Sequence, residues 1–166
     1  MTNETVQVAI IMGSDSDLPV VEASFSILDD FGVKYTKNVM SAHRTPYDVM
    51  ELIKNSEENG CKVFIAAAGM AAHLAGAVAA HSTKPVIGIP IESGGMGGID
   101  SLLSTAMMPP GVPVATVAIG KSGAKNSAIL AVQILATCDK ELAQKLVEYK
   151  QNMRSEVLEK DKKLNS

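Results

Sequence analysis

Short apolar segments alternate with helix-length amphipathic segments along this chain. Five of the apolar segments are rich in β-branched residues or alanine, which is typical of strands buried on both faces of a sheet. They span residues 6–12, 33–40, 62–68, 85–91 and 113–119. The pattern therefore predicts five strands, of which 33–40 is the weakest.

The segments between these strands carry helix signals. Residues 14–17 offer several N-cap side chains, and an apolar stripe at helical spacing follows until Gly32 ends it. A second helix opens at Thr45-Pro46 and is expected to bury Val49, Met50 and Ile53. Further helices are expected over residues 71–80, 101–107 and 124–138. Strands separated by helices predict a doubly wound α/β fold, with a parallel sheet covered on both faces.

The C-terminal segment has a different composition. Residues 139–166 hold 13 of the 33 charged side chains, and apolar residues recur in them at spacings of three and four. This pattern predicts an amphipathic helix with a solvated face, whose apolar stripe packs on the sheet domain or on another subunit. We expect residues 1–166 to form one α/β domain that includes this extra helix.

Composition narrows the class of protein. The 166 residues carry a net charge of −3 and only six aromatic side chains, without Trp, which argues against a nucleic-acid-binding surface. Two cysteines provide neither a disulfide framework nor a metal site, so we expect a reducing compartment. The chain has no apolar run long enough for a membrane span, and its polar start lacks the layout of a signal peptide. We therefore predict a soluble cytoplasmic protein.

Candidate chemistry gathers where the predicted strands end. Segments 13–17, 41–46, 69–76 and 93–98 each follow a strand and are rich in small or polar residues. Ligands bind at the carboxyl ends of strands in open parallel sheets, so we expect a site at this edge. In the first segment Ser14 could bind a phosphate and Asp17 could accept hydrogen bonds from ribose hydroxyls, although helix capping alone also explains both residues.

The second segment carries a stronger signal. His43 and Arg44 stand side by side in a chain with only three histidines and two arginines. Arg44 can clamp a phosphate at two points, and a histidine exchanges protons near neutral pH. A solvated surface pair is the alternative interpretation. His73 in the third segment is more typical of a structural residue, as is His81, and Cys61 and Cys138 are expected to be buried.

Four motifs carry a resemblance to a known family. MGSDSD, SAHRTP, AGMAAHLAG and GIDSLLSTAMMPPGVPVATVAIG occur in this order over nearly the whole chain. Together they resemble the catalytic subunit family of phosphoribosylaminoimidazole carboxylase, in its branch of N5-carboxyaminoimidazole ribonucleotide mutases. The resemblance implies a three-layer α/β/α sandwich of the flavodoxin-like type. It also implies a homo-octamer without metal or organic cofactor, supplied with substrate by an ATP-dependent carboxyaminoimidazole ribonucleotide synthase.

The resemblance also implies roles for individual residues. His43 would be the general acid and base, while Ser14, Asp17 and Arg44 would bind the ribonucleotide. Ser41 and the backbone from Gly69 to His73 would complete the pocket. The chain departs from the family pattern at Met70, Ala75 and Met107, which affects only the local shape of the pocket.

Three other functions remain to be weighed. The direct carboxylases of the same family, which add CO2 to aminoimidazole ribonucleotide, typically have SAHK and lack the AAHL sequence that this chain carries at residues 71–74. A phosphorelay receiver needs an acceptor aspartate at the end of its third strand, where this chain has Ala66–Ala68. A flavin carrier needs aromatic residues around its ring, and the candidate loops offer only Tyr47.

Overall fold

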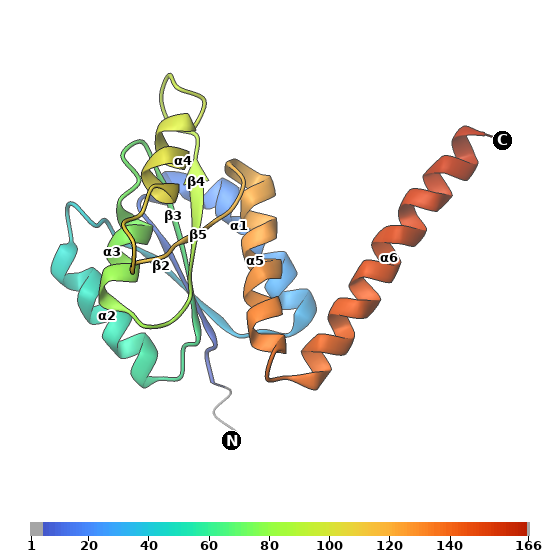
Figure 1. The fold of residues 1–166 in the computed structure, drawn as a ribbon, viewed down its shortest axis with the longest axis horizontal. Coiled ribbons are helices and arrows are strands. Elements are labelled where there is room, and N and C mark those ends of the chain that lie inside the picture. Colours follow the sequence, from blue (N-terminus) through green and yellow to red (C-terminus); the bar gives the residue numbers. More distant parts are fainter. Residues whose placement is uncertain (1–4, 166) are drawn as a thin grey trace.

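A parallel sheet of five strands lies at the centre of the computed structural model, which describes residues 5–165 (Figure 1). The strand order is β2-β1-β3-β4-β5, the flavodoxin-like order. The strands are β1 (Val8–Met12), β2 (Tyr35–Val39), β3 (Val63–Gly69), β4 (Val86–Ile91) and β5 (Ala115–Thr116). All neighbouring strands pair in parallel, which confirms the doubly wound fold. Residues 1–4, part of the predicted polar start, and residue 166 lie outside the described residues.

Helices cover both faces of the sheet (Figure 1). They are α1 (Leu18–Phe31), α2 (Pro46–Glu58), α3 (Leu74–His81), α4 (Ile99–Ala106), α5 (Gly120–Ala136) and α6 (Lys140–Leu164), with a short 3-10 turn η1 (Asp15–Asp17) before α1. Gly32 ends α1 in the left-handed conformation, with φ of 73°. None of these helices is both long enough and apolar enough to cross a membrane, within residues 5–165.

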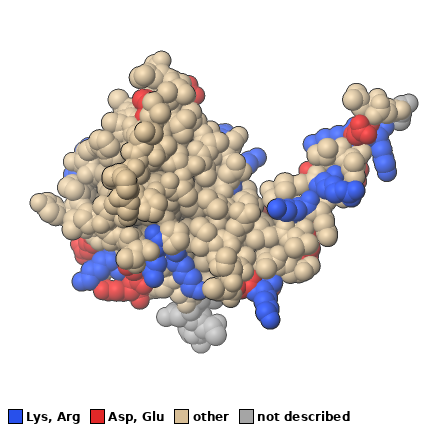
Figure 2. Space-filling view, viewed as in Figure 1, with Lys and Arg blue, Asp and Glu red and all other residues tan. Residues whose placement is uncertain are grey.

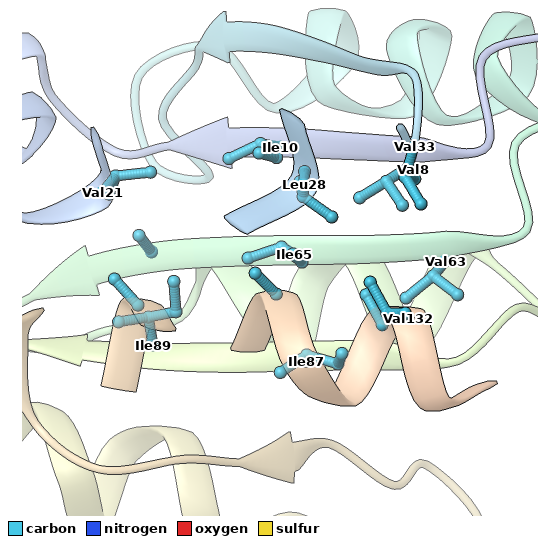
Figure 3. Packing of buried hydrophobic residues seen from close by; sticks show 14 of the residues in the cluster. Val8, Ile10, Val21, Leu28, Val33, Val63, Ile65, Ile87, Ile89 and Val132 are labelled. Atoms are coloured by element: carbon cyan, nitrogen blue, oxygen red, sulfur yellow. The ribbon is translucent and has the colours of Figure 1, made fainter. Parts of the chain in front are cut away.

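Alternate residues of β1, β3 and β4 enter two separate cores. On β1, Val8 and Ile10 face α1 and α5, whereas Ala9 and Ile11 face α2 and α3. Figure 3 shows the first core, in which side chains of β1, β3 and β4 meet those of α1 and α5. Because both faces of these three strands are buried, β1, β3 and β4 are almost wholly apolar, and reactive side chains are left to the loops at their ends. The edge strand β2 is only partly buried and carries Thr36, Lys37 and Asn38.

The helix α6 projects from the rest of the molecule (Figure 1). Its first turns pack on the domain: Leu142 is buried, and the Tyr149 ring lies 5.6 Å from that of Phe31. Farther along, Met153 and Val157 of the predicted apolar stripe are 42% and 64% exposed. Figure 2 shows Lys and Arg side chains gathered along this projecting part. Only the first half of the stripe is therefore buried within the chain.

Three local predictions are wrong. Met50 is 43% exposed, because Val49 and Ile53 already occupy the buried face of α2 and Met50 lies about 100° round the helix from Val49. Cys138 is exposed rather than buried, because α5 ends at Ala136 and Cys138 lies in the link to α6. The strand expected over residues 113–119 is reduced to β5, an edge strand of two residues that follows Pro113 and pairs with β4 only at Ile87 and Gly88.

Candidate functional site

A cleft of about 510 Å³ opens at the carboxyl edge of the sheet, where β1 lies between β2 and β3. The loops after these three strands line it, and every residue that the sequence singled out as a candidate site residue contributes to its wall. These residues are Ser14, Asp17, Ser41, His43, Arg44, Gly69 and His73. A larger hollow of about 660 Å³ lies at the opposite edge of the sheet, beside the end of α2, and contains none of them. The carboxyl edge is the place where open parallel sheets bind ligands.

The loop after β1 is held by a reciprocal capping arrangement. Ser14 N–H donates to Asp17 Oδ2 at 3.1 Å, and Ser16 N–H donates to Ser14 Oγ at 3.2 Å. The predicted capping is thereby confirmed. Asp17 is only 6% exposed, and this burial is the main reason why its pKa is raised. The Ser14 N–H lowers that pKa, whereas the charge of Asp15 raises it further.

The loop after β2 is a turn tied together by Ser41 and Thr45. Thr45 N–H donates to the Ser41 carbonyl at 2.8 Å, and Thr45 Oγ1 accepts from Ser41 N–H at 2.9 Å. Arg44 N–H donates to Ser41 Oγ at 3.2 Å. With the backbone fixed in this way, the side chains of His43 and Arg44 are presented at the cleft.

Two contacts join this turn to the neighbouring loops. Arg44 Nη2 donates to the Gly13 carbonyl at 3.1 Å, which links the loops after β1 and β2. His43 Nε2 lies 2.6 Å from His73 Nδ1, with the two ring planes at 75°, which links the loops after β2 and β3. His73, for which the sequence favoured a structural role, thus directly contacts His43.

Ser93 and Met70 also line the wall; the sequence placed both in segments at this edge but gave neither a binding role. Ser93 lies two residues after the end of β4, and a Cβ built on Gly69 would lie 1.9 Å from Ser93 Oγ, so that Gly69 and Ser93 pack together in the wall. The place of Ser93 in the loop after a strand was the available signal. Met70, the one non-glycine residue with positive φ (55°) among residues 5–165, also lines the cleft. Of the predicted segment 93–98, only Ser93 does so.

The described residues contain no group of three or more His, Cys, Asp or Glu side chains placed to hold a metal ion. What the cleft offers instead is a guanidinium, a buried carboxyl group, serine hydroxyls and a histidine pair. These groups can bind a phosphorylated, hydroxyl-bearing ligand and move a proton on it.

Comparisons with known proteins agree on one family. The model of the AIR carboxylase family matches residues 7–156. The chain is 52% identical over 158 residues to the N5-carboxyaminoimidazole ribonucleotide mutase of Thermotoga maritima, a match that covers 95% of this chain and 91% of that protein. For the mutase of Bacillus subtilis the identity is 51%, covering 95% and 97%, and for that of Escherichia coli K12 it is 48%, covering 95% and 93%.

A solved structure shows the same architecture. The crystal structure of Treponema denticola PurE superposes with a TM-score of 0.88 at 32% sequence identity, and the match covers 96% of this chain and 99% of that one. The order of strands and the three-layer arrangement are therefore those of a known fold.

Proposed function

This chain belongs to the AIR carboxylase family, and we propose that the cleft at the carboxyl edge of its sheet is where it performs that family's chemistry. The reaction converts N5-carboxyaminoimidazole ribonucleotide to 4-carboxy-5-aminoimidazole ribonucleotide, so that one carboxylate moves from N5 to C4. The enzyme is an isomerase of de novo purine biosynthesis. The observation that carries the placement is that one cleft brings together Arg44, Asp17 and the His43–His73 pair.

The phosphate and ribose bind at the loops after β1 and β2. Arg44 supplies a planar guanidinium, already oriented by its hydrogen bond to the Gly13 carbonyl, which can grip a phosphate at two points. Ser14 Oγ at present donates to Asp15 Oδ1, and it exchanges this exposed hydrogen bond for one to the phosphate. The buried carboxylate of Asp17 accepts hydrogen bonds from ribose hydroxyls, which compensates for its desolvation.

The base of the nucleotide lies toward the loop after β3. Ser41, Gly69 and His73 complete this part of the wall. Gly69 lets the nucleotide approach the backbone closely, because no side chain stands between the two. Binding energy from the distant phosphate thereby holds the reacting atoms in register with His43.

His43 moves the proton in both halves of the reaction. It donates a proton to N5 while the N5–carboxylate bond breaks, which leaves a neutral aminoimidazole and CO2 in the cleft. C4 then attacks the CO2 carbon, and the proton leaves C4 for the same histidine. One imidazole serves as acid and then as base, so the proton count balances over the cycle.

Our proposal for the assembly and the cellular compartment of the enzyme rests on its similarity to the same mutases. We propose a homo-octamer built from single-domain chains of residues 1–166, and the exposed half of the α6 stripe is available for contacts between subunits. Residues 5–165 hold two free cysteines, which suits a reducing cytoplasm. The carbamate substrate is supplied by an ATP-dependent synthase acting on the free aminoimidazole ribonucleotide.

An isotope experiment separates the mutase from a direct carboxylase. The N5 carbamate is labelled with heavy carbon, and the reaction runs in a large excess of unlabelled bicarbonate. A mutase keeps most of the label in the C4 carboxylate, at a rate insensitive to bicarbonate. Efficient use of free aminoimidazole ribonucleotide, with loss of nearly all label to the solvent, would overturn the assignment. His43→Asn serves as the control for non-enzymatic decomposition of the carbamate.

A further inference from the structure

The contact between His43 and His73 restricts where protons can sit. The two facing ring nitrogens, His43 Nε2 and His73 Nδ1, are 2.6 Å apart, which is a hydrogen-bonding distance. A hydrogen bond between two imidazole nitrogens needs one N–H and one lone pair, so these two nitrogens share a single proton. The pair can then hold one positive charge at most while the contact lasts.

The acid step of the proposed reaction determines which ring is the donor. When His43 is the imidazolium that protonates N5, both of its ring nitrogens carry protons. His43 Nε2 must then donate, and His73 Nδ1 must accept with its lone pair. His73 is consequently neutral and carries its own proton on Nε2.

We propose that His73 is a positioning residue that reserves one nitrogen of His43 for catalysis. This inference rests on the proposed function. His43 Nε2–H stays bonded to His73 Nδ1 throughout the cycle, and only His43 Nδ1, which has no hydrogen-bond partner among residues 5–165, exchanges a proton with the substrate. Loss of the Nδ1 proton leaves the neutral tautomer that the His73 contact already favours, so the ring need not turn between the two steps.

The arrangement uses the same principle as the acid that orients the histidine of a catalytic triad, except that here the acceptor is itself an uncharged ring. Both histidines lie on loops, so the contact fixes the orientation of the His43 ring where no helix or strand does. The other charged groups of the cleft are Arg44, which is bonded to the Gly13 carbonyl, and Asp17, which is bonded to Ser14 N–H. Neither has a hydrogen bond to the histidine pair, so the acceptor role falls to His73.

Two substitutions of His73 distinguish a positioning role from a contribution to packing alone. His73→Asn places an amide oxygen close to the position of Nδ1, so it keeps an acceptor that cannot take up a proton. His73→Leu keeps the bulk of the side chain and removes the acceptor. We expect His73→Leu to lower kcat by about 10- to 100-fold, the range typical when the partner that orients a metal-ligating histidine is lost, with KM within about threefold. His73→Asn should recover most of the loss.

The tautomer of His43 can be measured directly, without turnover. The chain has only three histidines, so the ¹⁵N shifts of its ring nitrogens can be assigned by substitution. In the unliganded wild type, neutral His43 should be protonated on Nε2, and it should remain so in His73→Asn. In His73→Leu it should become a mixture of tautomers. His81→Leu, at an exposed histidine at the end of α3 outside the cleft, is the matched control.

The two hypotheses fail in different ways. A wild type that turns over normally, alongside a His73→Leu variant with unchanged kcat and unchanged His43 tautomer, would refute the role of His73 and leave the mutase assignment intact. Protonation of neutral wild-type His43 on Nδ1 would also refute it. Absence of mutase turnover in the wild type would instead refute the proposed function.

Discussion

Gly69 packs against Ser93 so closely that a single methyl group should disturb the wall of the cleft. In Gly69→Ala the new Cβ would lie 1.9 Å from Ser93 Oγ, 2.9 Å from Ser93 Cβ and 3.1 Å from the Ile91 carbonyl oxygen. The hydroxyl can rotate away at little cost. The other two atoms cannot, because Gly69 and Ile91 are register partners at the ends of β3 and β4, so the strand ends must move apart.

The size of the effect follows from these contacts. Overpacking of this kind costs about 1–3 kcal/mol. Gly69 does not have positive φ, so alanine suits its backbone and recovers about 0.4–1 kcal/mol through the unfolded chain. We therefore expect the free energy of unfolding to fall by roughly 1–2 kcal/mol. For a chain of this size that lowers Tm by about 2–8 °C.

A double-mutant cycle identifies the cause. Ser93→Gly removes two of the three close atoms and leaves only the carbonyl at 3.1 Å. In that background Gly69→Ala should cost less than half of what it costs in the wild type, as measured by urea unfolding of all four proteins. Gly95→Ala is the matched control: its Cβ meets nothing within 4 Å, so its stability should not fall. Equal costs of Gly69→Ala in both backgrounds would refute the packing argument.

Three further predictions concern the groups that bind and react. His43→Asn should lower turnover by at least the roughly 10²–10⁴-fold typical of losing a general acid and base while nucleotide titration stays normal, and near-normal turnover would remove His43 from that role. Arg44→Ala should weaken nucleotide affinity, with little change in the Tm of the unliganded protein because the hydrogen bond that it removes is exposed. Arg44→Lys should weaken it too, since an ammonium lacks the two-point fork; wild-type affinity in either variant would contradict the phosphate assignment. Asp17→Asn should be more stable than the wild type at pH 7 but bind nucleotide less tightly. The raised pKa of Asp17 means that the folded state binds more protons than the unfolded state. Wild-type stability therefore falls as pH rises from the ordinary pKa of 3.8 through the raised pKa. The Tm values of the wild type and of Asp17→Asn should converge below that pH window, and curves that fail to do so would contradict this.

The parts of the fold that depend on local signals could be predicted from the sequence. Strand and helix order follow from short-range patterns, and so do the cap at Ser14 and the end of α1 at Gly32. The errors arise where tertiary context decides. Met50 has the same apolar character as its buried neighbours, and its orientation on α2 decided its exposure. Cys138 lies just beyond a helix end, and helix ends are not set by hydrophobicity alone.

The residues of the candidate site could be predicted from the sequence, but the contacts between them could not. Strand ends indicated which residues reach the carboxyl edge, but a pattern along the chain does not give the lateral order of strands. The contacts between His43 and His73, between Arg44 and Gly13, and between Gly69 and Ser93 all join segments at the ends of different strands. Such pairs depend on sheet order, which is a property of the whole fold.

Sheet order explains why these loops form a cleft instead of a flat surface. β2 and β3 flank β1, so the loops that follow them start two strand spacings apart, or about 10 Å. Between them the chain after β1 turns at once into η1 and α1, which leaves the space above Gly13 open. His43 and His73 reach across this space from opposite sides and meet. An arrangement with β2 and β3 adjacent would close the gap, so the position of β1 between them creates both the cleft and the distance that the histidine pair spans.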